Sequence, residues 1–364
     1  EVNQIVTNAI MRGFKKIDHY TFKGSLDGWM YAIASHALYD FIRNEKESRV
    51  SYVETVPDKS GGDSSKPAGD LKEEFKLFKK TITPKQRMAK TGKMGIKDYM
   101  LYDKVEPEPS IETVQNVIAE FKPKNPSCII GLGGGSSLDV AKYAGAEMKL
   151  EKTLIPTTFG TGAEMTTYCV LKFDGKKKLL REDRFLADRA IVDSYFMEGT
   201  PEQIVKNSVC DACAQATEGY DSKLGNEFTR TMCKQAFEVL YDAIINNKPE
   251  NYPYGSMLSG IGFGNCSTTL GHALSYVFSN EGVAHGYSLS SCTTVAHKFN
   301  KSIFYEQFKE VIEKLKFDRM SLKAPLDQAA DVVMTDKGHL DPNPKPVTKQ
   351  DVIQCLQDIV DGKL

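Results

Sequence analysis

The stretch IIGLGGGSSLDVAKYAGAEM, residues 129–148, decides the fold of the chain. Its apolar start predicts a buried strand, three glycines follow at Gly133–Gly135, and the pattern after them is helical. Because glycine lacks a Cβ atom, these backbone amides can approach a ligand closely. A helix that begins at Ser136 or Ser137 adds free N–H groups, which favours a phosphate or pyrophosphate. The alternative is a turn without a ligand, since the stretch is neither the G-x-G-x-x-G fingerprint nor a P-loop.

The totals predict a chain of two or three domains. It has 364 residues, 41% of them hydrophobic, and a net charge of −1, which gives no overall attraction to nucleic acid or membrane. No apolar run is long enough for a membrane-spanning helix, so we expect no membrane association. The eight cysteines are scattered, and the pair Cys210 and Cys213 is more typical of buried small side chains than of a zinc or redox site. A reducing, cytoplasmic setting fits this cysteine usage.

Strand and helix patterns alternate in the middle of the chain. The segment DYMLYDKVEPEPS, 98–110, predicts a strand that leads into a Pro-rich turn, and a helix capped by Ser110 follows it. Two further strands are predicted around 127–135 and 152–158, with a helix between them, which favours a parallel sheet with helical crossovers. From about residue 201 the strand signals stop. We expect the following organisation: a helical segment at 1–56, a linker and amphipathic helix at 57–92, a Rossmann-like nucleotide-binding domain at 93–195, and a helical domain at 196–364.

Threonines follow the second of these strands. IPTTFGTGAEMT, 155–166, places Thr157, Thr158 and Thr161 around two glycines. Hydroxyls and free amides at the carboxyl end of a parallel strand are where α/β sheets bind ligands. An ordinary loop capped by threonine is the alternative.

Two of the six histidines occur close together in the second half, at His272 and His285. Upstream, Asp211 and Gln215 are four residues apart on one face of a predicted helix. Asp211, His272 and His285 could be three ligands of a divalent metal, and the amide oxygen of Gln215 a fourth; such a set suits Fe²⁺, Mn²⁺ or Zn²⁺. Taken alone, His272 is better explained as a histidine satisfied within the core than as a metal ligand.

Several of these motifs occur together in the order found in one family. The chain resembles the iron-containing (group III) alcohol dehydrogenases over about residues 93–364. The resemblance is carried by GLGGGSSLDVAK, IPTTFGTGAEMT, RFLADRAIVD, DACAQATEGYDS, GHALSY, HGYSLS and DPNPKPVTKQDV. It implies a Rossmann-like parallel sheet, here with an incomplete N-terminal half, followed by an all-helical metal-binding domain.

The resemblance also implies roles for individual residues. The cofactor would be held by Gly133, Gly134, Gly135, Ser136, Thr158, Thr161 and Lys178, with Lys178 near the ribose. The metal would be held by Asp211, Gln215, His272 and His285.

The sequence departs from the family pattern at two positions. The family usually has histidine where this chain has Gln215, and a second histidine where this chain has Tyr276. A similar pattern occurs in the branch that looks like phosphonoacetaldehyde reductases. The amide makes the metal site weaker and harder in character, so the identity of the metal and even its retention stay open. His272 and Tyr276 are the candidate catalytic residues, with Tyr276, or a water near it, relaying a proton. For Tyr276 the alternative is a side chain that merely fills the cleft.

The first segment has a different character. GWMYAIASHALYDFIR, 28–43, resembles region 2 of small alternative RNA polymerase sigma factors, and LKEEFKLFKKTITPKQRM, 71–88, is similar to the start of their region 4. If this segment is functional, the resemblance implies RNA polymerase or promoter DNA as a partner. A solvated helical face around a small core is the alternative.

We therefore expect a metal-dependent alcohol dehydrogenase or aldehyde reductase that uses NAD or NADP and a divalent metal, iron first, with manganese or zinc as alternatives. Hydride transfer between the nicotinamide and a small alcohol or aldehyde is the implied reaction. Nicotinamide binding should be weak, because the adenosine-binding half is replaced. A homodimer is compatible with this interpretation. The other hypotheses are a sigma-like protein that binds RNA polymerase and promoter DNA, and an inactive chimera.

Overall fold

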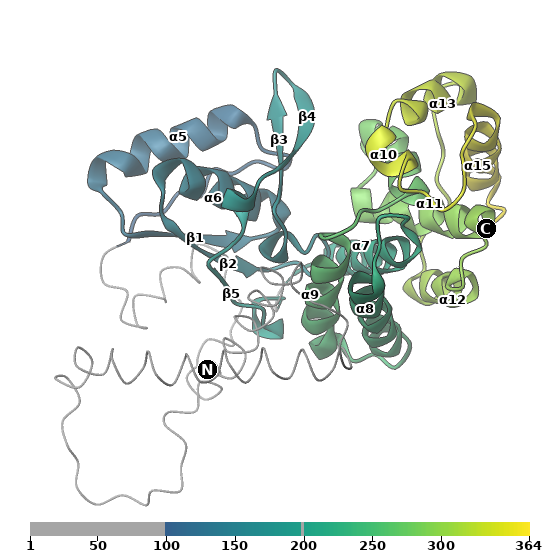
Figure 1. Cartoon of the computed structure of the whole chain (residues 1–364), viewed down its shortest axis with the longest axis horizontal. Coiled ribbons are helices and arrows are strands. Elements are labelled where there is room, and N and C mark those ends of the chain that lie inside the picture. The colour runs from purple at the N-terminus through teal and green to yellow at the C-terminus, as the bar shows by residue number, and fades with distance from the viewer. Residues whose placement is uncertain (1–98, 198–199) are drawn as a thin grey trace, which may run out of the picture. The chain divides into compact units, whose positions relative to one another are not determined.

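The computed structural model describes residues 99–197 and 200–364 (Figure 1). The predictions for the segment 1–56 and the linker 57–92 fall outside these residues.

The first described part is built around residues 129–148. Strands β1 and β2 pair in parallel, from Cys128 opposite Glu151 to Gly133 opposite Pro156, and the helix between them is the crossover. Figure 1 shows this helix, α6, between α5 and the two strands. The elements are α5 (Ile111–Phe121), β1 (Cys128–Gly133), α6 (Gly135–Met148), β2 (Glu151–Pro156), β3 (Tyr168–Phe173), β4 (Lys176–Arg181) and β5 (Arg189–Ala190).

The crossover helix α6 packs through its apolar face. Leu138 and Ala144 are fully buried with Leu154 of β2 and Val114 of α5 in one core. The same helix also buries a charged side chain, Lys142. Its ammonium donates to the carbonyl oxygens of Ala163, at 2.7 Å, and of Tyr168. Since buried charges need partners, this side chain fastens the segment after β2 to α6.

The strand predicted at the start of 98–110, before the Pro-rich turn, is wrong for its described part. Residues 99–109 form no regular strand, and only an isolated bridge joins Ser110 to Lys172 of β3. Pro107 and Pro109 have no N–H to donate to a ladder. The next predicted feature is confirmed: Ser110 caps α5, and its hydroxyl accepts from the Thr113 N–H at 3.3 Å.

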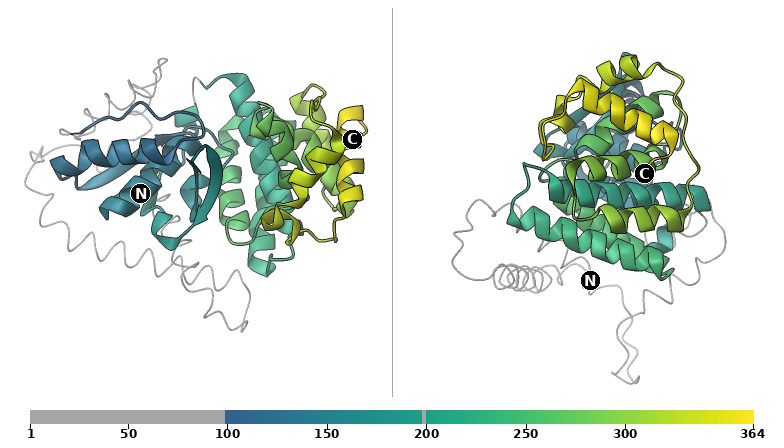
Figure 2. Two further views of the ribbon diagram at one scale, coloured as in Figure 1. Left: turned by 90° about the horizontal axis from the view of Figure 1, so that it is seen from above. Right: turned by 90° about the vertical axis from the view of Figure 1, so that its right-hand side faces the viewer.

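The second described part is helical, as the loss of strand signals after residue 201 predicts. Figure 2 shows its long helices packed side by side. The helices are α7 (Glu202–Asp221), α8 (Glu227–Ile245), α9 (Tyr252–Phe263), α10 (Leu270–Asn280), α11 (His285–Asn300), α12 (Tyr305–Leu315), α13 (Leu326–Met334), α14 (Lys337–Leu340) and α15 (Lys349–Asp361). An apolar core joins α10, α11, α13 and α15 and includes Leu274, Ala296 and Val352. Among the described helices, we find none with the length and apolar character that a bilayer crossing requires.

Candidate active site

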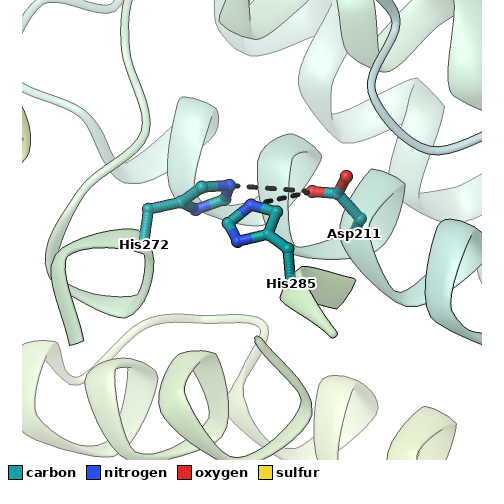
Figure 3. Close-up of side chains that lie close together, drawn as sticks. All are labelled: Asp211, His272 and His285. Carbon is teal, nitrogen blue, oxygen red and sulfur yellow. Dashed lines mark ion pairs between the residues drawn. The ribbon is translucent and has the colours of Figure 1, made fainter. Parts of the chain in front are cut away.

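Three side chains from three helices converge in the helical part. Asp211 comes from the middle of α7, His272 from the first turn of α10, and His285 is the first residue of α11. Figure 3 shows both imidazoles directed at one carboxylate. The Asp211 Oδ1 atom lies 3.7 Å from Nε2 of His272 and 3.9 Å from Nε2 of His285. Within the described residues, this is the group whose ligand atoms all lie within 4.8 Å of one another.

The carboxylate of Glu218 orients His272. Its Oε2 atom lies 2.7 Å from Nδ1 of His272 and accepts the Thr269 N–H at 2.8 Å. Burial opposes a charge on the His272 ring, but Glu218 and Asp211 outweigh it and raise the pKa of His272 to about 9. Since an ionised carboxylate only accepts, Nδ1 keeps its proton, and Nε2 is the nitrogen that faces Asp211 and would lose its proton to bind a metal. A carboxylate behind a histidine is the usual arrangement at metal sites.

His285 differs from His272 in its electrostatics. Desolvation of the imidazole ring by the surrounding protein lowers the pKa of His285 to about 4, although 38% of the side-chain surface is exposed. Asp211 opposes this shift, whereas the charges of His272, Lys177 and His339 add to it. A neutral imidazole is the form that binds a metal.

Gln215 contacts this cluster, but through its amide nitrogen and not its amide oxygen. Its Nε2 donates to Asp211 Oδ1 at 2.9 Å, while its Oε1 is buried without a partner in the described part of the chain. An unpaired buried amide oxygen needs a partner, and a cation would supply one. The two amide atoms are exchanged by a turn of the side chain's last bond, so the donor set fits a divalent metal. The prediction that Gln215 is a ligand stays a prediction.

Two more rings surround the ligands. Tyr276 stacks on His285, with ring centroids 6.1 Å apart, and the ring of His339 lies parallel to His272 at 5.9 Å. Burial raises the pKa of Tyr276, and nearby Asp336 adds to the shift, so its hydroxyl stays protonated at neutral pH. Asp336 also holds His339, through Oδ2 at 2.7 Å from Nδ1.

Sequence reasoning missed Glu218 and His339. Glu218 follows Asp211 by seven residues, which places the two carboxylates on one face of α7, and this spacing could have identified it. His339 comes from the short helix α14, and no local pattern links it to the metal ligands.

The residues predicted to bind the cofactor meet at the ends of β1 and β2. A Cβ atom added to Gly134 would lie 3.3 Å from Thr158 Oγ1, and one added to Gly135 would lie 3.0 Å from Thr161 Cγ2. Gly133 has φ +154°, and a Cβ there would lie 2.6 Å from Ser137 Oγ. The turn therefore keeps its backbone open only because it is glycine, which suits a pyrophosphate. The helix begins at Gly135, slightly before the predicted Ser136 or Ser137.

The lysines of the β3–β4 hairpin lie differently. Lys177 pairs with Glu108, whose backbone N–H donates to Ser136 Oγ at 3.2 Å. The ammonium of Lys178 instead lies 5.1 Å from the ring centre of Phe173. These contacts link Lys177 to the glycine turn, and the predicted contact of Lys178 with the cofactor stays a prediction.

The glycine turn and the histidine cluster belong to one compact unit, which holds the described residues up to Asp188 and those from Val192 onward. The loop after β2 touches α7: a Cβ on Gly160 would lie 2.6 Å from the Ser208 carbonyl oxygen. Ser208 precedes Asp211 by three residues, or about 4.5 Å along a helix axis. The threonine loop therefore lies one helical turn from the metal-ligand candidates.

Comparisons with known proteins agree with this arrangement. The family model "Iron-containing alcohol dehydrogenase" matches residues 79–194, and "Fe-containing alcohol dehydrogenase family, C-terminal" matches residues 205–335. Sulfoacetaldehyde reductase of Bilophila wadsworthia is 31% identical over 266 residues, which cover 65% of this chain and 68% of that relative. The 4-hydroxybutyrate dehydrogenase of Clostridium kluyveri is 31% identical over 236 residues, 57% of this chain and 61% of its own length. The chain thus spans about two thirds or less of these relatives.

Solved structures show the same fold. A sulfoacetaldehyde reductase from Bifidobacterium kashiwanohense, solved with NAD⁺, matches with a TM-score of 0.69 at 19% identity, over 76% of this chain and 89% of that one. An iron-containing alcohol dehydrogenase from Thermococcus thioreducens also matches with a TM-score of 0.69. The match is 20% identical and covers 81% of this chain and 91% of that one. These matches confirm the predicted fold class, and the family models confirm the predicted enzyme class. The chain belongs to the iron-containing alcohol dehydrogenase family.

Proposed function

We propose that the chain is a metal-dependent, NAD(P)-linked reductase of small aldehydes that carry an anionic group. The observation that carries the proposal is the convergence of Asp211, His272 and His285 one helical turn from the loop that meets the glycine turn. Hydride transfer needs a nicotinamide and a polarised carbonyl side by side, and this arrangement offers both places.

The roles of the residues follow from their contacts. When bound, the metal supplies Lewis-acid polarisation of the carbonyl oxygen, and the reduced nicotinamide supplies the hydride. Asp211, His272 and His285 would hold the metal, with the oxygen of Gln215 as a fourth donor. Gly133–Gly135 would hold the pyrophosphate. Tyr276 keeps its proton at neutral pH and would donate it, directly or through a water, toward the oxygen of the product alcohol.

Two sequence likenesses support an anionic substrate. Two of the matched relatives are a sulfoacetaldehyde reductase and a 4-hydroxybutyrate dehydrogenase, and both named compounds are anions at neutral pH. The Gln215 and Tyr276 pattern resembles the phosphonoacetaldehyde reductases, whose substrate is also an anion.

Lys177 is the group we propose to recognise that anion. Its ammonium is joined through Glu108 to the glycine turn, and its charge lowers the pKa of His285. We propose that it lies near both the cofactor turn and the metal ligands, between which the substrate would bind. Glu108 also pairs with Lys172 at 2.9 Å, so a substrate anion could take Lys177 while Glu108 keeps a partner.

The activity is tested by following the oxidation of NADH and NADPH with sulfoacetaldehyde, phosphonoacetaldehyde, succinic semialdehyde and propanal. We expect turnover with the metal-loaded protein, loss of it on treatment with a chelator, and recovery on adding Fe²⁺, Mn²⁺ or Zn²⁺. Asp211→Asn keeps the side-chain volume and should lower kcat/KM at least about 100-fold, because it weakens the ligand set. Full activity in the chelated protein would contradict the proposal.

The substrate class is tested with two neighbouring lysines. Lys177→Met should raise KM for sulfoacetaldehyde about tenfold, the loss of one charge-assisted hydrogen bond. It should leave KM for propanal unchanged, because propanal carries no anion. Lys178→Met is the matched control, since it removes the same charge on the adjacent residue, and we expect it to leave the ratio of the two KM values as in the wild type. An equal loss with both aldehydes in Lys177→Met would overturn the role in recognition.

Four earlier predictions remain beside this proposal. We place the protein in the cytoplasm, because it would draw on the cellular NAD(P) pool and all eight of its cysteines are free thiols. The homodimer and the weak nicotinamide binding stay predictions. So does the sigma-like role of residues 1–56, which would be tested by binding to core RNA polymerase.

A further inference from the structure

The C-terminal motif DPNPKPVTKQDV has no part in the mechanism above, yet one of its residues reaches the helix that carries His272. Asn343 is fully buried, and its Oδ1 accepts the N–H of Leu270, the first residue of α10, at 3.3 Å. The first N–H groups of a helix have no partner within the helix. Glu218 takes the preceding one, at Thr269, so α10 begins on two external acceptors. His272 follows two residues later.

The amide of Asn343 is fully used. Its Oδ1 also accepts from Asn300 Nδ2 at 2.8 Å, while its Nδ2 donates to Asn300 Oδ1 at 2.9 Å and to the Lys345 carbonyl oxygen at 2.8 Å. An amide offers two acceptor and two donor positions, and all four are taken here. Neither a carboxylate nor an apolar side chain could make the same set.

The partner of this amide matters as much as the amide itself. Asn300 is the last residue of α11, and His285 is the first residue of that helix. The Asn300–Asn343 pair therefore joins the start of one ligand-bearing helix to the end of the other. The tight fit continues at Gly271, where a Cβ atom would lie 1.9 Å from Glu218 Oε1, so the first turn of α10 has little room to shift.

We infer that Asn343 is a positioning residue, which fixes the first turn of α10 and with it the direction of the His272 imidazole at the candidate metal centre. This inference rests on the proposed function in so far as it assumes that a metal binds there. Removing the amide leaves the Leu270 N–H and both polar ends of Asn300 without a buried partner, which costs free energy unless the backbone moves. Movement of Leu270 carries His272 with it.

Removing a residue with a purely structural role would also lower the stability of the protein. The test must therefore separate lost stability from lost positioning of His272. Val352 is fully buried in the core that α10 and α11 share with α15, and its apolar side chain takes no part in the hydrogen bonds at the start of α10. Val352→Ala is therefore the matched control for lost core stability. The full-length chain is used throughout.

The measurement is the dissociation constant of Co²⁺ for the metal-free protein, by titration calorimetry and by the visible absorption of the bound ion, together with the Tm of each metal-free variant. We expect Asn343→Ala to weaken Co²⁺ binding at least about tenfold, the lower bound usual for groups that orient a ligand, and to alter the absorption band. Val352→Ala should lower Tm and leave the Co²⁺ affinity within about twofold of the wild type.

If Asn343→Ala does not fold, Asn300→Ala decides, because it frees the Asn343 amide to turn away from Leu270. It should weaken Co²⁺ binding at least about threefold relative to Val352→Ala, a smaller effect because the acceptor for Leu270 remains. Co²⁺ binding by the decisive variant equal to that of Val352→Ala would overturn the inference alone. A wild-type protein that binds no Co²⁺ would overturn both the inference and the proposed function.

Discussion

At the scale of single residues, the centre depends on groups that do not coordinate. Glu218 is a case in point, because one carboxylate oxygen serves both the His272 ring and the start of α10. Although burial favours the neutral acid, the bonds from His272 and Thr269 hold the pKa of Glu218 below its ordinary value. The charge that results fixes which nitrogen of His272 is free for a metal.

Glu218→Gln tests this dependence, because glutamine keeps the size of the side chain and removes its charge. We expect the dissociation constant for Zn²⁺ or Co²⁺ to rise about 10- to 100-fold. Asp221→Asn, on the same helix and 3.5 Å from the non-ligand His297, is the control and should leave the constant unchanged. Wild-type metal affinity in Glu218→Gln, measured by titration calorimetry, would remove Glu218 from the site.

At the scale of elements, the sequence pattern predicted those helices, turns and caps that depend on neighbouring residues alone. The strand, turn and helix around Gly133–Gly135 followed from an apolar run and a glycine cluster, and the Ser110 cap of α5 from its position before a helical period. The start of 98–110 has apolar residues typical of a strand, but no ladder forms over 99–109. Which strand pairs with which is a tertiary outcome that alternation alone does not determine.

The distinction between local pattern and tertiary packing also applies to the residues of the site. Asp211, His272 and His285 could be singled out because histidines are few and the family motifs fix their spacing. His339 could not, because its place beside His272 depends on how α14 packs against α10. Gln215 shows a third case: its position was predicted, but which of its amide atoms faces Asp211 depends on what occupies the centre.

The start of α5 allows a prediction at this scale. The Glu106 carboxylate accepts from the Ser110 N–H at 2.9 Å and from the hydroxyl of Thr113, and these bonds outweigh the opposing effect of burial to lower its pKa to about 2. Because the folded pKa lies below the ordinary 4.5, the stabilisation is complete above pH 4.5 and is lost as the pH falls toward 2.

Glu106→Gln should therefore lower Tm at pH 7, and the difference from the wild type should shrink as the pH approaches 2. Thermal unfolding followed by circular dichroism across this range gives the comparison. Glu112→Gln, in the first turn of α5, serves as the control and should not reproduce the pH-dependent difference. A Tm difference that stays constant with pH would show that the carboxylate bonds do not stabilise the helix start.

At the scale of the whole described molecule, two kinds of architecture share one compact unit. The parallel strand pair supplies open backbone at its carboxyl end, and the helices supply imidazoles and carboxylates that strands of this length could not bring together. The strand pair alone would lack the metal ligands, and the helices alone would lack the nucleotide-binding turn, and hydride transfer requires both. The contact of Gly160 with Ser208 brings the two requirements within one turn of the same helix.

That contact has a thermodynamic consequence. The helix α7 touches the threonine loop at Ser208 and carries Asp211 one turn further on, and a helix shifts along its axis more easily than it stretches. A nucleotide that repositions the loop would thus change the free energy of cation binding. Linkage then requires the cation to change nucleotide affinity by the same factor. We therefore expect the affinities for nucleotide and cation to be coupled, and the close approach of Gly160 to Ser208 is where that coupling would pass.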